Sequence, residues 1–307
     1  MTSLAFLPLP HQTILMKNKP TLCLYHNDAD GRASAAIVRR ALGSEIVLHE
    51  INYGNPIPWD KIEAAEQVVI VDFSLPAADM QHIVDTKSLI WIDHHQSALD
   101  ELGTISMEWD GARDTSEAAC VLTWRYFYPS DEVPQAIVLV GDRDIWRWAE
   151  KDTGAFSEGL FQQYNQPEND KLWEPLLNND KQAVQRIIDQ GAVLLDARLR
   201  SIRGEVNNYG YPARFEGYRT LVINRSGNGD LGARIRELGY QIAYCYVDNV
   251  QNGELKTFVS LYSDEIDVSK IARKFGGGGH PGASGFNFKR GATPFPPEAK
   301  AYIVDEG

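Results

Sequence analysis

The sequence predicts an α/β protein of two domains: an N-terminal domain with helices on both faces of a parallel sheet, and a smaller C-terminal α+β domain across a cleft. Two observations predict this arrangement. From residue 21 to residue 92, short apolar runs alternate with polar turns and helix-like segments, which is the order of elements in βαβ units. After loop formers at 207–212, strand-like runs dominate. The 307 residues also exceed one typical domain.

The N-terminal elements follow in order along the chain. Strand-length apolar runs stand at 21–25, 46–51, 68–71 and 88–92, and helix-like segments stand at 32–42, 79–84 and 116–127. An apolar run at 135–140 leads into Gly141–Asp144, and residues 171–203 have the periodicity of a long helix. Parallel strands share one carboxyl edge, where ligands bind.

The C-terminal elements are strand-like runs at 218–223, 241–247 and 256–262, followed by a helix at 268–275. We therefore expect an N-terminal extension at 1–19, a first domain at 20–206, a linker at 207–216 and a second domain at 217–307. The alternative is that 207–212 is a turn inside one large domain.

Composition narrows the class of protein. A net charge of −12 argues against broad adhesion to long duplex nucleic acid, which needs many Lys and Arg contacts. No apolar run approaches the roughly 18 residues that span a membrane, and Pro8 and Pro10 interrupt the N-terminal apolar patches. Three cysteines far apart argue against a disulfide framework, so we expect a cytoplasmic protein.

Polar clusters follow three of the expected strands. His26, Asp28 and Asp30 follow the first, Asp72 the third, and Asp93-His94-His95 the fourth. Carboxylates and imidazoles at the ends of buried strands are costly to desolvate unless a partner such as a divalent metal holds them. Taken alone, residues 28–31 are better explained as a helix cap, Asp72 equally well as one, and His94-His95 is more often a pair hydrogen-bonded to backbone. Their joint occurrence at successive strand ends favours a metal site.

The residue types indicate how such a site is divided. Asp72 has two oxygens that can bridge two cations, His94 can ligate through one ring nitrogen, and Asp93 can orient a neighbouring imidazole. Asp142 or Asp144 completes the set, and we favour Asp142 because it comes first after the apolar run. Mixed His and carboxylate ligation suits Mn²⁺, with Mg²⁺ or Co²⁺ as alternatives. The neighbouring Trp146 and Trp148 are expected in the core rather than as a base-stacking platform.

A second signal is the glycine-rich run at 276–285. Consecutive glycines, among them Gly277, Gly278 and Gly279, let backbone N–H groups approach an anion, and His280 adds a donor. The run is not a Walker loop, because no Lys-Ser or Lys-Thr follows it. The alternative interpretation is that this run is only a turn between a helix and a strand.

These residues resemble the DHH phosphoesterases that carry a C-terminal DHH-associated domain. The first motif of that family is similar to 26–31, the second to Val71-Asp72, the third to Asp93-His94-His95 and the fourth to 141–144; the run 275–286 resembles the glycine-rich GGGH signature. The resemblance covers roughly residues 20–289. It departs from the family at Tyr262, where many relatives have arginine, so Arg225, Arg234 or Arg273 would have to supply that cation.

The resemblance implies a catalytic N-terminal domain with two metals, usually Mn²⁺. His26, Asp28 and Asp72 would hold one metal, and Asp30, Asp72, His94 and Asp142 or Asp144 the other. A hydroxide between the metals would attack phosphorus, with His95, Asp72 and Asp93 as the catalytic group. His95 would face the phosphate. Gly277, Gly278, Gly279 and His280 would bind substrate from across the cleft.

The expected function is that of a Mn-dependent phosphodiesterase or exonuclease acting on short oligonucleotides or dinucleotides. Two alternatives stay open. One is a phosphomonoesterase (acting on a nucleoside bisphosphate) or pyrophosphatase of the same fold, and the other is a non-catalytic nucleotide-binding module. The sequence leaves the natural substrate and the oligomeric state open, a homodimer included.

Overall fold

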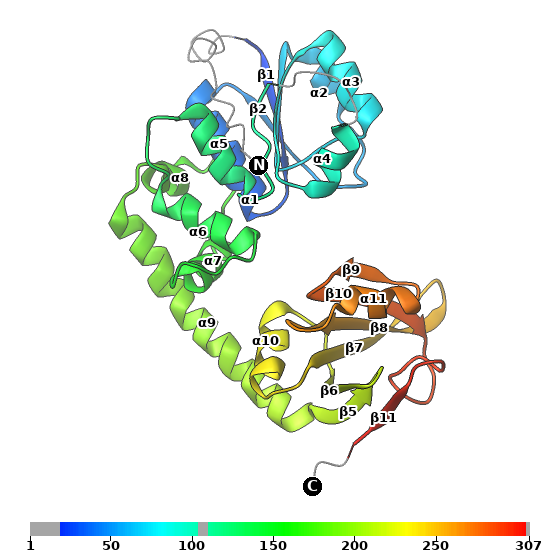
Figure 1. Cartoon of the computed structure of the whole chain (residues 1–307). Coiled ribbons are helices and arrows are strands. Elements are labelled where there is room, and N and C mark those ends of the chain that lie inside the picture. The colour runs from blue at the N-terminus through cyan, green and yellow to red at the C-terminus, as the bar shows by residue number, and fades with distance from the viewer. Residues whose placement is uncertain (1–18, 104–109, 305–307) are drawn as a thin grey trace, which may run out of the picture. The chain divides into compact units, whose positions relative to one another are not determined.

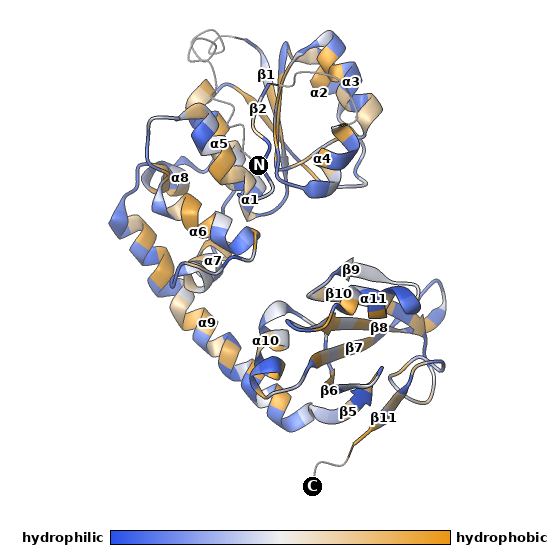
Figure 2. Cartoon of the chain, in the orientation of Figure 1, coloured by the Kyte–Doolittle hydropathy of each residue, from blue (hydrophilic) through white to orange (hydrophobic). Residues whose placement is uncertain are grey.

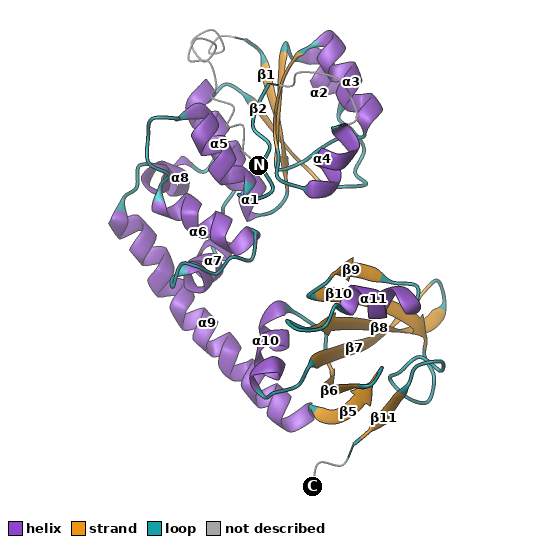
Figure 3. Cartoon of the chain, in the orientation of Figure 1, coloured by secondary structure: helices purple, strands orange, loops and turns teal. Residues whose placement is uncertain are grey.

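The computed structural model describes residues 19–103 and 110–304, and it divides into two compact units. Unit 1 ends at Leu195 and unit 2 begins at Asp196, both inside one long helix, α9 (Lys181–Tyr209). Figure 1 names the elements and Figure 3 shows their types. None of the described helices is long and apolar enough to cross a bilayer.

Unit 1 is built on a four-stranded sheet, and all of its strands run parallel. The strands are β1 (Thr21–His26), β2 (Val47–Ile51), β3 (Gln67–Val71) and β4 (Ser88–Ile92), in the order β2-β1-β3-β4. All of β3 is buried, and the strands are predominantly hydrophobic in Figure 2. Because the strands are parallel, their carboxyl ends meet at one edge.

Helices cover both faces of this sheet. Alternate residues of each strand point to opposite faces: Leu22 packs with α2 (Trp59–Ala64), α3 (Ala77–Thr86) and α4 (Gln96–Leu102), whereas Cys23 packs on the other side. The helices on that other side are α1 (Ala29–Leu42), α5 (Ala119–Phe127), α6 (Gln135–Asp144), α7 (Thr153–Phe161), α8 (Asp170–Leu177) and the first part of α9. The predicted α/β class is confirmed.

Unit 2 contains a seven-stranded sheet in which β6 and β7 are parallel and the other neighbours antiparallel. In spatial order the strands are β11 (Ala301–Ile303), β5 (Tyr211–Phe215), β6 (Tyr218–Asn224), β7 (Ile242–Gln251), β8 (Glu254–Tyr262), β10 (Ala283–Lys289) and β9 (Gly278–His280). Helix α11 (Val268–Lys274) packs on one face; α10 (Gly229–Glu237) and the end of α9 pack on the other.

The boundaries differ from the sequence-based prediction in three places. The expected linker at 207–216 is the last turn of α9 followed by β5, so no linker separates the units there. The helical stretch at 171–203 is two helices, separated by a turn in which Asn179 has a φ of 57°. The expected extension at 1–19 lies outside the described residues except for Lys19.

Candidate metal centre

The carboxyl edge of the parallel sheet in unit 1 collects the polar groups that the sequence singled out. His26 ends β1, Asp72 follows β3, and Asp93 follows β4. Helix α1 begins beside them and supplies Asp28 and Asp30, while Asp144 is the last residue of α6. Residues more than 100 positions apart in the sequence therefore meet at this edge.

One group of possible ligands contains His26, Asp28 and Asp72. The His26 Nδ1 atom lies 2.6 Å from Asp28 Oδ2 and 3.7 Å from Asp72 Oδ2. The other ring nitrogen, Nε2, is 3.3 Å from the side-chain oxygen of Asn52. Because that oxygen can only accept, it holds the proton on Nε2 and leaves Nδ1 free to ligate.

A second group contains Asp30, His94 and Asp144. The His94 Nε2 atom lies 3.3 Å from Asp144 Oδ2, 3.7 Å from Asp30 Oδ2 and 3.3 Å from Asp72 Oδ1. Asp30 is fixed in place because its two oxygens accept hydrogen bonds from the Ala119 and Cys120 backbone N–H groups at the start of α5. Its carboxylate keeps further lone pairs for a cation.

Asp72 stands between the two groups, and its environment fits a pair of divalent cations. The residue is buried and has a φ of 54°, a left-handed conformation that is uncommon outside glycine. Both of its carboxylate oxygens, and His94 Nε2, are buried without a hydrogen-bond partner. Buried carboxylate oxygens are normally paired. A carboxylate that faces one His/Asp group with each oxygen suits a bridging ligand, and oxygen and imidazole donors suit divalent cations such as Mn²⁺.

The electrostatics of the cluster agree with this interpretation. Burial raises the pKa of Asp72 well above its usual value, and burial next to other carboxylates also raises the pKa of Asp30 and of Asp144. The hydrogen-bonded Asp28 and the nearby Asp72 raise the pKa of His26 to about 10. Several buried carboxyl groups at this edge are thus disfavoured in their charged form, which a bound divalent cation would stabilise.

Asp28 has a second role at the start of α1. Burial by itself would raise its pKa, but hydrogen bonds from His26 and from the Gly31 N–H hold the pKa at about 2. The Gly31 N–H donates to Asp28 Oδ1 at 2.9 Å, which makes Asp28 the N-cap of the helix. A Cβ at Gly31 would lie 2.2 Å from the His26 carbonyl oxygen, so only glycine lets α1 begin this close to β1.

Asp93 and His95 form a separate hydrogen-bonded unit. One carboxylate oxygen of the buried Asp93 accepts from the His94 N–H, the His95 N–H and His95 Nδ1, at 2.8, 3.2 and 2.8 Å. The hydrogen bond to Asp93 raises the pKa of His95 to about 9. With Nδ1 occupied, the Nε2 atom of His95 is the ring nitrogen left for another partner.

The two aspartates near the end of α6 do not share a role. Asp142, which the sequence analysis favoured, lies outside the cluster: its buried carboxylate accepts from the backbone N–H groups of Ala149 and Glu150 and from the Thr153 hydroxyl. Asp144 is the one that faces His94. Successive residues of a helix are about 100° apart, so positions i and i+2 face different directions.

Trp146 and Trp148 are not in the core as predicted. They are 56% and 42% exposed, and both have a positive φ, of 54° and 53°. The Arg143 guanidinium lies 4.5 Å from the Trp146 ring centre and 5.1 Å from that of Trp148. The hydrogen bonds to Asp142 hold the turn that presents these rings.

The substrate-binding residues expected from the glycine-rich run lie in unit 2. Gly277 precedes β9, and Gly278, Gly279 and His280 form it, paired with β10 at the edge of the sheet. Gly278, Gly279 and His280 are exposed. Arg225, the proposed replacement cation, is 2.6 Å from Glu205 in α9. Tyr262 packs between Gly227 and Gly232, where a Cβ would lie 2.7 Å from its ring.

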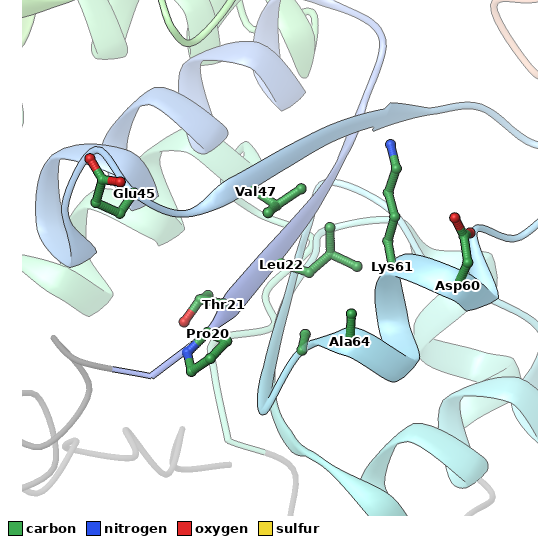
Figure 4. Close-up of a pocket in the computed structure, with 9 residues that line it drawn as sticks. Pro20, Thr21, Leu22, Glu45, Val47, Asp60, Lys61 and Ala64 are labelled. Atoms are coloured by element: carbon green, nitrogen blue, oxygen red, sulfur yellow. The ribbon is translucent and has the colours of Figure 1, made fainter.

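The pocket in Figure 4 is not part of the metal centre. Its volume is about 390 Å³, and it is lined by residues that include Thr21 and Leu22 of β1, Val47 of β2 and Lys61 of α2. Thr21 and Val47 begin their strands, so this pocket lies at the amino edge of the sheet.

Asn52 is a residue of the centre that the sequence analysis missed. It follows directly after β2, which ends at Ile51 beside His26 in the sheet. The signal was present, because a polar residue at a fourth strand end obeys the same rule as the other three.

Comparisons with known proteins agree with the fold. The chain is 28% identical to an uncharacterized protein of Acanthamoeba polyphaga mimivirus, over 93% of this chain and 72% of the relative. It is 23% identical to the oligoribonuclease NrnB of Bacillus subtilis (strain 168), over 85% of this chain and 71% of that protein. The solved structure of the DHH domain of a member of the s1p family of ribosomal proteins matches with a TM-score of 0.56 at 13% identity, over 89% of this chain and 83% of that one.

No protein-family model matches the chain. The structure nevertheless has a parallel sheet with polar clusters at its strand ends, and a second sheet. These features are consistent with the match to an oligoribonuclease. The chain is thus similar in sequence to an oligoribonuclease and in fold to a DHH domain.

Proposed function

We propose that this protein is a Mn²⁺-dependent phosphodiesterase that hydrolyses short oligonucleotides or dinucleotides and releases nucleoside monophosphates. The observation that carries the proposal is Asp72, a buried carboxylate whose two unpartnered oxygens face two separate His/Asp groups. The relative named as an oligoribonuclease supports the choice of a short nucleic acid as substrate.

The residues of the candidate metal centre have distinct proposed roles. His26, Asp28 and Asp72 would hold one cation, and Asp30, Asp72, His94 and Asp144 the other. Two cations so held would lower the pKa of a water between them and supply a hydroxide at neutral pH. Asp93 fixes the His95 ring through Nδ1, so that Nε2 can donate to a phosphate oxygen and stabilise the charge that develops there.

Substrate length and location follow from other features. The net charge of −12 disfavours extended contact with a phosphate backbone, because such contact needs many cations. We assign substrate binding to Gly277, Gly278, Gly279 and His280 of unit 2, whose exposed backbone can approach an anion. The cysteines are buried free thiols, which suits the reducing cytoplasm.

The test is a panel of substrates with metal-depleted protein to which Mn²⁺ is restored. The panel contains a short RNA, a short single-stranded DNA, a cyclic dinucleotide, adenosine bisphosphate and pyrophosphate. We expect turnover of the short oligonucleotides, abolished in Asp72→Ala and retained in the control Asp85→Asn, an exposed carboxylate of α3. A preference for pyrophosphate would replace the proposed substrate class, and full activity in Asp72→Ala would refute the mechanism.

A further inference from the structure

Tyr53 places an aromatic ring beside the metal centre and leaves about half of it in solvent. Its side chain is 53% exposed, and its ring centre lies 6.0 Å from that of His26 and 6.4 Å from that of His95. An exposed tyrosine is ordinary on a protein surface. A tyrosine ring this close to two imidazoles of a candidate active site, however, can contact a ligand bound there.

The ring has a fixed support. Its centre lies 4.6 Å from that of Phe73, with the ring planes at 40°. Phe73 is buried in the core that the sheet forms with α2, α3 and α4. Phe73 directly follows Asp72, so the aromatic support and the bridging carboxylate come from one turn. A tyrosine has few rotatable bonds, and packing on Phe73 reduces its freedom further, so binding against it costs little entropy.

The backbone ties Tyr53 to the metal centre. The Tyr53 N–H donates to the Asn52 side-chain oxygen at 2.8 Å, and the same oxygen is the partner of His26 Nε2. The Asn52 N–H in turn donates to the side-chain oxygen of Asn55 at 2.9 Å, which closes the turn. One amide oxygen thus sets both the imidazole that can ligate the cation and the residue that carries the ring.

We propose that Tyr53 is the stacking surface for a nucleobase next to the scissile phosphate. The inference rests on the proposed function, and it adds a residue that determines which phosphodiesters are used. A planar apolar face beside an anion site matches a nucleotide, whose base is planar and whose phosphate is charged. Because every base has such a face, stacking here gives preference for nucleotides over simple phosphate esters without selecting a sequence.

The exposed Trp146 and Trp148 are the competing surface. Their rings are already engaged with Arg143 and with each other, and within the described part of the chain they have no ring contact with His26, His94 or His95. The Tyr53 ring lies beside those of His26 and His95, which is why it is preferred.

The test is steady-state kinetics with Mn²⁺ on the dinucleotide pApA and on two analogues, each lacking one of the two bases. The variants are Tyr53→Ala, Tyr53→Phe and the control Tyr164→Ala. Tyr164 is another exposed tyrosine of unit 1, and its hydroxyl donates a hydrogen bond to Glu168. We expect Tyr53→Ala to lower kcat/KM for pApA by roughly 5- to 150-fold, mainly through KM. The loss should vanish on one of the two analogues, and Tyr53→Phe and Tyr164→Ala should behave like the parent protein.

Two outcomes overturn the inference. An equal loss in Tyr53→Ala on pApA and on both analogues would assign Tyr53 a structural role, and no loss on pApA would remove it from the site. A binding arm separates this inference from the proposed function: calorimetric titration with adenosine monophosphate and with ribose 5-phosphate, both with Mn²⁺. If the parent protein hydrolyses no oligonucleotide, the proposed function fails. Tighter binding of adenosine monophosphate than of ribose 5-phosphate, abolished in Tyr53→Ala, would still support the stacking surface. The same preference in the parent protein and in Tyr53→Ala would refute it.

Discussion

Asp142 and Asp144 are two residues apart, and the structure predicts opposite consequences for replacing them. Asp142 is buried and accepts three hydrogen bonds, two from the turn after α6 and one from Thr153 at the start of α7. Removing an ionised acceptor costs about 1.5 to 3 kcal/mol per hydrogen bond. Taking the lower bound for each, we expect Asp142→Ala to lose about 4.5 kcal/mol, or about 9 to 18 °C in Tm for a unit of this size.

Asp144→Ala should behave in the reverse way. Burial and the nearby Asp30 carboxylate raise the pKa of Asp144, so without added metal its removal relieves desolvation and repulsion and leaves Tm equal or higher. The parent protein should gain about 2.7 kcal/mol from Mn²⁺ at a hundred times Kd. Asp144→Ala should lose most of this gain.

Calorimetric melting of metal-depleted protein, with and without Mn²⁺, measures both effects. Asp142→Ala should melt early yet keep its response to Mn²⁺, and Asp142→Asn serves if the alanine variant does not fold. A normal metal-free Tm in Asp142→Ala together with no response to Mn²⁺ would refute the assignment of the two residues.

Three further predictions concern the same edge of the sheet. Burial and neighbouring carboxylates raise the pKa of Asp30 and of Asp144 on folding, so the stability that their protonated forms give is present at low pH and is lost as pH rises above the usual carboxyl range. Mn²⁺ should therefore raise Tm more at pH 7 than at pH 5, and equal shifts would contradict this. Gly31→Ala should destabilise the fold in urea, whereas Gly204→Ala, which meets nothing within 4 Å, should stabilise it by about 0.5 to 1 kcal/mol. Asn52→Ala should weaken Mn²⁺ binding about 10- to 100-fold in a titration, and unchanged affinity would remove Asn52 from the centre.

The strand-end clusters were predictable because their geometry is local. A buried strand followed by polar residues fixes where those residues emerge, and parallel pairing then brings His26, Asp72 and Asp93 to one edge. The choice between Asp142 and Asp144 was not predictable, because it depends on how α6 is rotated against its neighbours. Sequence spacing carries no information about that rotation.

The burial of the tryptophans and the division between the units were hard to predict for a related reason. Trp146 and Trp148 are apolar, but a turn with positive φ, held by the Asp142 carboxylate, carries them outward. The loop formers at 207–212 did mark the end of a helix, since α9 stops at Tyr209. They did not mark the division between units, because a helix can leave one core and enter another without any break in its backbone pattern.

Helix α9 has a practical consequence for dissecting the protein. Its first turns are packed into the core of unit 1 through Val184 and Ile187, and its last turns into unit 2 through Ile202 and Val206. A cut at the loop formers would leave unit 2 without the helical segment that closes its core, and unit 1 with an unsupported helical tail. Proteases that attack flexible linkers should therefore find no favoured site between Val184 and Val206, and an isolated unit 1 is better ended within the helix near Leu195.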